Sequence, residues 1–136
     1  MADRPGRFPL ELSEEEWRAR LSPEQYRVMR QHGTEPPGSC ALLKETRPGR
    51  FRCAACGNPL FESRTKFDSG TGWPSFDRPI PGALGASLDR RFGMVREEVH
   101  CANCGSHLGH VFPDGPPPTG LRYCINGIAL VFEPEG

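Results

Sequence analysis

The sequence predicts an α+β fold that is mainly β, with N-terminal helices packed on an antiparallel, strongly bent sheet. Helix-start signals fill the first third of the chain, whereas from Phe51 onward short apolar runs are bounded by Gly, Pro, Asn or Asp. The chain has 136 residues, enough for one domain over residues 1–136. Only 36% of the residues are hydrophobic, with 16 Gly and 15 Pro, so the core should be thin and benefit from a crosslink.

Two consecutive helices are expected over about residues 13–33. Each starts with a capping box, in which a Ser is followed three residues later by Glu or Gln; the pairs are Ser13–Glu16 and Ser22–Gln25. Pro23 suits the first helical position, and Gly33 is the expected end of the second helix. The apolar stripes would consist of Trp17, Leu21, Tyr26, Met29 and Val28.

A Pro-rich loop is expected over residues 34–50, because GTEPPGSC suits neither a helix nor a central strand. The β part, residues 51–133, should follow. Its strand signals lie in FRCAACGNPLF, TKFDSGTGWPSF, MVREEVHC and LRYCINGIALVF. The segment PDGPPPTG, residues 113–120, is expected to be a loop.

Charge and hydropathy exclude several partner classes. Basic and acidic residues number 17 each, so no overall field attracts nucleic acid, and no cluster of Lys or Arg with exposed aromatics supports a nucleic-acid-binding zinc ribbon. No apolar run approaches the ~20 residues that span a bilayer. The N-terminus lacks the apolar core of a secretory signal, so we expect a cytoplasmic protein whose cysteines bind metal or react.

Four of the six cysteines form two matched knuckles of the type C-x-x-C-G. They are Cys53, Cys56, Cys101 and Cys104. Four thiolates around a tetrahedral centre are typical of structural Zn²⁺, which we favour over a redox pair or plain buried thiols. The neighbouring histidines are not assigned to the metal because the thiolates complete the tetrahedron, and His100 is expected to lie in solvent.

The cysteines outside the knuckles are Cys40 and Cys124. Strand alternation in LRYCINGIAL places one set of side chains in the core, namely Leu121, Tyr123 and Ile125. The opposite face then carries Arg122, Cys124 and Asn126. A structural cysteine would sit among apolar residues, whereas Cys124 lies beside a permanent positive charge that favours the thiolate. We therefore interpret Cys124 as reactive rather than structural.

Two further segments indicate a site of the same kind. His107 and His110, near the apolar Phe112, are possible proton donors, although two half-exposed loop histidines are the simpler interpretation. Trp73 lies between Gly and Pro in a loop, where it is either a core residue or the floor of a pocket; Phe76 is expected in the core.

In their order, these motifs resemble those of the B-type methionine sulfoxide reductases, which are selective for the R epimer at sulfur. The motifs are GTEPP, RTKFDSGTGWPSF, the paired knuckles, HLGHVF and RYCING. The resemblance runs from about Ser13 to Phe132. It implies a zinc-stapled β-tent, with two antiparallel sheets and N-terminal helices, that repairs oxidised methionine.

The resemblance also implies roles for the site residues. Cys124 would attack the sulfoxide sulfur, and Arg122 would help to hold it as a thiolate. His107, His110 and Asn126, with a water, would protonate or hydrogen-bond the departing oxygen. Trp73 would surround the substrate's S-methyl group, and Phe112 would line the same substrate site.

The sequence departs from the family at one position. Many members carry a resolving cysteine inside SGCGWPSF, where this chain has Thr71. By the resemblance to relatives with a cysteine in an N-terminal loop, Cys40 would resolve the sulfenic acid of Cys124 as a disulfide that thioredoxin reduces. Direct reduction by an external thiol is the alternative for this step. For the whole chain, the alternatives are a monomeric reductase, which we expect, and a non-catalytic zinc-bound β-tent that binds a ligand.

Overall fold

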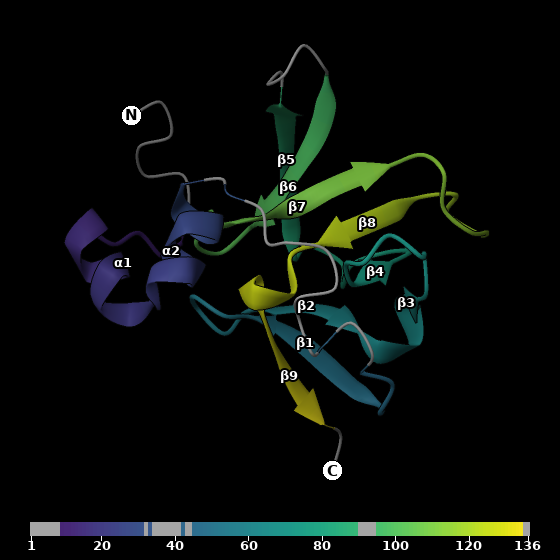
Figure 1. The fold of residues 1–136 in the computed structure, drawn as a ribbon, viewed down its shortest axis with the longest axis horizontal. Helices are drawn as coiled ribbons and strands as arrows, with labels where there is room; N and C mark the ends of the chain where they lie inside the picture. The colour runs from purple at the N-terminus through teal and green to yellow at the C-terminus, as the bar shows by residue number, and fades with distance from the viewer. Residues whose placement is uncertain (1–8, 32, 34–41, 43–44, 90–94, 135–136) are drawn as a thin grey trace.

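The structure is a computed structural model that describes residues 9–31, 33, 42, 45–89 and 95–134. In this part of the chain, two short helices adjoin two antiparallel sheets (Figure 1). The elements are α1 (Glu14–Arg20), α2 (Pro23–Arg30), β1 (Gly49–Cys53), β2 (Pro59–Glu62), β3 (Lys66–Phe67), β4 (Ser75–Phe76), β5 (Leu84–Asp89), β6 (Arg96–Cys101), β7 (His107–Phe112), β8 (Arg122–Ile125) and β9 (Leu130–Pro134).

The strands form a three-stranded sheet in the order β2-β1-β9 and a six-stranded sheet in the order β3-β4-β8-β7-β6-β5. Every pair is antiparallel. Figure 1 shows the smaller sheet in the lower part of the molecule, β5 to β8 above it and the helices to one side. The predicted fold class, two antiparallel sheets with N-terminal helices, is confirmed.

Both helices begin at the predicted capping boxes, with both reciprocal bonds of each box present. All five residues of the predicted apolar stripes are buried. The predicted end of α2 was three residues too late: the helix stops at Arg30, and the Gly33 N–H instead bonds the Arg27 carbonyl 2.9 Å away. A glycine therefore follows the helix without being its last residue.

The core lies between the two sheets and is built around aromatic rings. Phe61 of β2 stacks on Phe76 of β4 with centroids 4.1 Å apart, and Phe51 of β1 meets Phe76 edge-on at 5.1 Å. All three rings are fully buried. Each such ring pair stabilises the fold by about 0.5–1.5 kcal/mol beyond the burial of its surface area. Phe76 of the larger sheet therefore packs against both rings of the smaller sheet, and its predicted position in the core is confirmed.

Two strands of the larger sheet, β5 and β7, were not among the predicted strands. β7 is HLGHVF, whose side chains are buried along almost the whole strand. A strand buried on both faces lacks the polar–apolar alternation that reveals a half-exposed one. The interpretation of its histidines as half-exposed loop residues is therefore wrong.

Two other expectations concern connecting segments. No helix or strand lies between Phe112 and Arg122, as predicted for residues 113–120. Most of the predicted loop 34–50, including Cys40, lies outside the described residues.

Among the helices described, none has the length and apolarity to cross a bilayer.

Candidate active site

Cys124 lies in the middle of the six-stranded sheet, on the short strand β8. Its cross-strand neighbours are His110 of β7 on one side and Ser75 of β4 on the other. Ile125 is fully buried in the core behind it. The alternation of β8 therefore turns the thiol away from the core, and pairing with β7 sets a histidine directly beside it.

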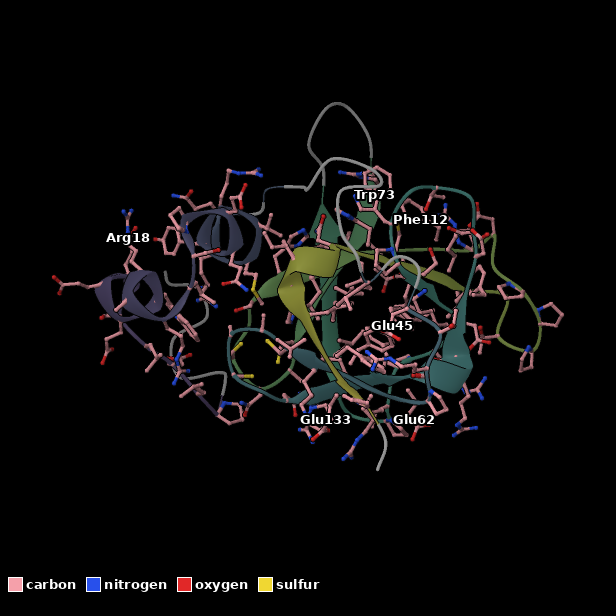
Figure 2. The ribbon with its side chains drawn as sticks, turned by 60° about the horizontal axis from the view of Figure 1, so that its bottom comes forward. Arg18, Glu45, Glu62, Trp73, Phe112 and Glu133 are labelled. Carbon is pink, nitrogen blue, oxygen red and sulfur yellow. The ribbon has the colours of Figure 1, made fainter. Side chains whose placement is uncertain are left out.

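A cavity of about 260 Å³ opens over this face of the sheet. Its lining residues come from four places in the sequence: Thr71 and Trp73, Arg96, Gly109, His110 and Phe112, and Arg122, Cys124 and Asn126. The volume lies below the range of pockets for drug-sized ligands and suits a single side chain. A larger groove of about 590 Å³, bordered by Glu62 and Glu133, contains no cysteine or histidine. Figure 2 shows these two glutamates far from Trp73 and Phe112.

Arg122 is paired with Asp114 and Phe112 at the edge of the cavity. Its guanidinium donates two bonds to the Asp114 carboxylate, Nε to Oδ1 at 2.9 Å and Nη2 to Oδ2 at 3.2 Å, and lies 4.4 Å over the Phe112 ring. The bond with Asp114 and, to a smaller extent, the Cys124 sulfur raise the pKa of the Arg122 guanidinium. A fixed positive charge beside the sulfur favours the thiolate.

The two histidines occupy different positions. His110 lines the cavity, whereas the side chain of His107 is 0% exposed and does not line it. An irregularity in the β6–β7 register places an additional residue, Leu108, in β7. Positions three apart in a regular strand face opposite ways, but this bulge brings the His107 and His110 rings to a T-shaped contact with centroids 5.5 Å apart.

Glu98 of β6 is the buried carboxylate that holds His107, and sequence reasoning missed it. Its Oε2 lies 2.9 Å from His107 Nδ1, and its Oε1 accepts from the Ser87 hydroxyl at 2.7 Å and lies 3.2 Å from His100 Nδ1. Burial raises the pKa of Glu98, but the hydrogen bonds with His100, His107 and Ser87 outweigh it and lower the pKa overall. His100 is therefore part of this network, and the expectation that it lies in solvent is wrong.

Asn126 and Gly109 fix the spacing between β7 and β8. Asn126 is buried; its side chain donates from Nδ2 to the Leu108 carbonyl at 3.0 Å, and its backbone N–H donates to the same oxygen at 2.9 Å. A Cβ on Gly109 would collide with the Cys124 carbonyl. A glycine between the two histidines therefore allows the backbone of β7 to lie against the strand of the thiol.

The loop before β4 closes the opposite side of the cavity. Trp73 is half-buried and lines it, so the second of its two interpretations from the sequence, the pocket, fits its position. The Thr71 hydroxyl lies 3.9 Å from the Cys124 sulfur. The position at which many family members carry a cysteine thus lies beside the nucleophile candidate.

The four knuckle cysteines converge on one point between the sheets. Their sulfurs lie within 4.8 Å of one another, with Cys53–Cys104 at 3.8 Å and Cys56–Cys101 at 3.6 Å. A tetrahedron with Zn–S bonds of ~2.3 Å has edges of about 3.8 Å, so the set fits Zn²⁺. The two knuckles have the same turn, because Gly57 and Gly105 adopt φ of 83° and 76° and bond the first Cys carbonyl. The predicted structural zinc site is confirmed.

The structure thus brings most of the residues singled out from the sequence to one cavity. These residues are Cys124, Arg122, Asn126, His110, Trp73 and Phe112. His107 lies behind His110 rather than in the cavity, and Cys40 is outside the described residues. Sequence reasoning missed Glu98, Arg96 and Asp114. Alternation in REEVHC, which puts Arg96, Glu98 and His100 on one face, was the available signal for two of them.

Comparison of the sequence with known proteins identifies its family. Residues 21–134 match the SelR domain. The chain is 60% identical over 123 residues to the peptide methionine sulfoxide reductase MsrB of Agrobacterium fabrum, covering 90% of this chain and 91% of that protein. It is 58% identical over 132 residues to the MsrB of Leifsonia xyli subsp. xyli, covering 96% and 95%. The chain belongs to the SelR-domain family of B-type methionine sulfoxide reductases.

Proposed function

We propose that this protein reduces methionine R-sulfoxide, free or within proteins, to methionine by attack of the Cys124 thiolate on the sulfoxide sulfur. The observation that carries the proposal is the cross-strand pairing of Cys124 with His110 inside a cavity lined by Trp73 and Phe112. A nucleophile and an acid thereby face the same small space. The family assignment supplies the reaction, and the selectivity for the R epimer rests on the family resemblance alone.

The reaction needs a nucleophile and an acid together. A sulfoxide sulfur is a poor electrophile until its oxygen is protonated, so attack and proton transfer must be concerted or closely coupled. The Cys124 thiolate forms a bond to sulfur, the oxygen takes up a proton, and the oxygen is then transferred to Cys124. The products are methionine and Cys124 sulfenic acid, the first and reversible step of thiol oxidation.

His110 is the better candidate for the acid. It lines the cavity beside Cys124, its cross-strand neighbour, whereas His107 is enclosed behind it and bonded to Glu98. The Asn126 amide, held by its Nδ2 bond to Leu108, would fix the sulfoxide oxygen near His110. His107 and Glu98 would act indirectly, by holding the His110 ring in place through the T-shaped contact.

Trp73 and Phe112 would provide the binding surface for the apolar part of the substrate's methionine sulfoxide side chain. Aromatic rings attract the polarizable sulfur and its methyl group by about 0.3–1.5 kcal/mol per contact. Phe112 is itself covered by the Arg122 guanidinium on one face, which fixes the ring. The aromatic residues would hold the sulfur near Cys124 while the polar residues bind its oxygen.

Regeneration would use Cys40 as the resolving cysteine. The sulfenic acid of Cys124 would condense with the Cys40 thiol, releasing water and forming a disulfide. This requires the two Cα atoms to come within about 7 Å. A thioredoxin-like dithiol would then reduce the disulfide. We also propose that the protein acts as a monomer in the cytoplasm, where such dithiols are kept reduced.

Intact-mass analysis of the reduced, zinc-loaded protein tests nucleophile and resolving cysteine at once. Methionine sulfoxide is added without a reductant, and the protein is then mapped by peptide mass. Loss of two hydrogens with a Cys40–Cys124 crosslink supports both assignments. A gain of one oxygen on Cys124 supports Cys124 as the nucleophile and excludes Cys40 as the resolving cysteine. An unchanged mass with no methionine released would favour the non-catalytic binding module.

A further inference from the structure

We propose that Thr71 is a further catalytic residue, whose hydroxyl donates a hydrogen bond to the Cys124 sulfur and is aimed there by Ser69 and Ser75. The proposal rests on the assignment of Cys124 as the nucleophile. From the sequence, Thr71 is notable only as the position at which many family members carry a cysteine. In the structure it belongs to a chain of hydroxyl groups that begins at the reacting sulfur.

The chain consists of three hydroxyls in series. Thr71 Oγ1 lies 3.9 Å from Cys124 Sγ and 2.8 Å from Ser69 Oγ. Ser69 Oγ lies 2.8 Å from Ser75 Oγ, and the Ser75 hydroxyl donates to the Trp73 carbonyl at 3.2 Å. Ser75 is fully buried and pairs with Cys124 across β4 and β8. The chain therefore connects Cys124 with the backbone that carries Trp73.

When Cys124 is a thiolate, two other groups can occupy the acceptors of Thr71, which directs its proton to the sulfur. A hydroxyl has one donor and two lone pairs. One lone pair of Thr71 Oγ1 receives the Trp73 N–H at 3.4 Å, and the other can receive the Ser69 hydroxyl. Cys124 Sγ is then the remaining contact for the Thr71 proton.

The chain can satisfy both protonation states of Cys124. With a thiol, four protons serve four contacts: sulfur to Thr71, Thr71 to Ser69, Ser69 to Ser75, and Ser75 to the Trp73 carbonyl. With a thiolate, the direction between Thr71 and Ser69 reverses and Thr71 donates to sulfur. One of the two contacts of Ser75, with Ser69 or with the Trp73 carbonyl, then lacks a proton.

The balance favours the thiolate. The lost contact is a neutral hydrogen bond, whereas the one gained at sulfur is charge-assisted and about twice as strong. A hydrogen bond to the charged form favours that form. The separation of Thr71 Oγ1 and Cys124 Sγ is long, at 3.9 Å, and catalytic hydrogen bonds commonly shorten in the substrate complex.

The test is the pH dependence of Cys124 alkylation by iodoacetamide in zinc-loaded protein carrying Cys40→Ser, with the modified cysteine identified by peptide mapping. Thr71→Val removes the hydroxyl with little change in size, and Thr71→Ser is the matched control that keeps it. We expect Thr71→Val to raise the alkylation pKa by about one unit, the shift that corresponds to the loss of one charge-assisted bond. Thr71→Ser should stay near the parent protein.

Ser69→Ala provides the second test, because it removes the donor to Thr71 without touching the contact with sulfur. Without Ser69, the Thr71 hydroxyl loses its alternative acceptor, and forming the thiolate no longer costs a contact within the chain of hydroxyls. We therefore expect a smaller shift in the opposite direction, to a lower alkylation pKa. An unchanged alkylation pKa in folded Thr71→Val, or in folded Ser69→Ala if the first variant does not fold, overturns the proposal. Alkylation does not depend on sulfoxide reduction, so a failure of the proposed function would appear separately, as absent methionine release by the parent protein.

Discussion

At the scale of single residues, the site depends on what faces the Cys124 sulfur: the His110 ring across one strand pair, the Arg122 charge and the Thr71 hydroxyl. Cys124→Ser changes one atom and keeps the shape of the cavity, but a serine hydroxyl does not ionise near neutral pH and cannot accept the oxygen as sulfenic acid. We therefore expect methionine release to fall to background in a single-turnover assay. Cys40→Ser is the matched control, since that variant should still release one methionine per chain.

Glu98 is the residue whose change should affect both stability and chemistry. Glu98→Gln preserves the size of the side chain but removes the charge that binds His107, His100 and Ser87. Hydrogen bonds to a charged group contribute about 1.5–3 kcal/mol, so we expect unfolding in urea to show a loss of about 2 kcal/mol at neutral pH. Methionine release should slow, because His107 no longer holds the His110 ring.

The pH dependence provides a control for this interpretation. The pKa of Glu98 is lower in the folded protein than in the unfolded chain. Its stabilising contribution is therefore present above the unfolded value, about pH 4.3, and is lost as the pH falls below it. The difference in stability between the parent protein and Glu98→Gln should shrink on acidification. A difference that is constant from pH 7 to pH 3.5 would show that the charge of Glu98 is not the cause.

At the scale of elements, the loop before β4 places residue 71 where a second thiol could bond to Cys124. Thr71 Oγ1 lies 3.9 Å from Cys124 Sγ, and the S–S bond of a disulfide is about 2.05 Å long, so the loop would have to bring a thiol at position 71 about 2 Å closer to bond. In a Cys40→Ser background, thioredoxin-driven turnover should stall after one methionine. We expect the added substitution Thr71→Cys to restore repeated turnover, measured as methionine released per chain.

Thr71→Ser in the same background is the control, since it keeps the hydroxyl and supplies no thiol. If both double variants turn over equally, resolution by an external thiol explains turnover and the loop geometry is irrelevant to it. If Cys40→Ser alone turns over normally, Cys40 has no part in the cycle.

Elements also decide what could be predicted from the sequence. β8 could be predicted down to the face of each residue, because its two faces differ in polarity: Tyr123 and Ile125 pack in the core and Cys124 opens to the cavity. β7 could not, because it is buried on both faces and its bulge at Leu108 places His107 and His110 on one side against the period of a strand. Register irregularities leave no local sequence signal, so the division of roles between these histidines required the structure.

At the scale of the whole molecule, the zinc site joins parts of the chain that local patterns describe separately. Cys53 ends β1 of the smaller sheet and Cys101 ends β6 of the larger one. The helices are tied to the same point, because Arg30 of α2 donates to the Cys104 carbonyl at 3.0 Å while its guanidinium lies 4.5 Å from the Trp17 ring. Both sheets and both helices are thus linked to the four-cysteine site.

Removal of zinc should therefore unfold the protein rather than loosen one corner. Zinc binding by structural thiolate sites contributes about 10–16 kcal/mol, comparable to or larger than the 5–15 kcal/mol that separates most folded domains from the unfolded state. We expect excess chelator to abolish cooperative thermal unfolding, followed by circular dichroism, and to abolish methionine release together with it. Cys101→Ser should give the same result without chelator and should reduce the zinc content from one ion per chain to a small fraction of that value.

Cys40→Ser is the appropriate comparison, because it also removes one of the six cysteines but none of the knuckle thiols. That variant should retain one zinc and its cooperative transition. The site around Cys124 lies on β8 and β7, in the same sheet as β6, whose end carries Cys101. A zinc-free protein that still unfolds cooperatively within a few degrees of the zinc-bound form would mean that the aromatic core between Phe51, Phe61 and Phe76 holds the sheets together unaided, and that the metal acts only locally on its knuckles.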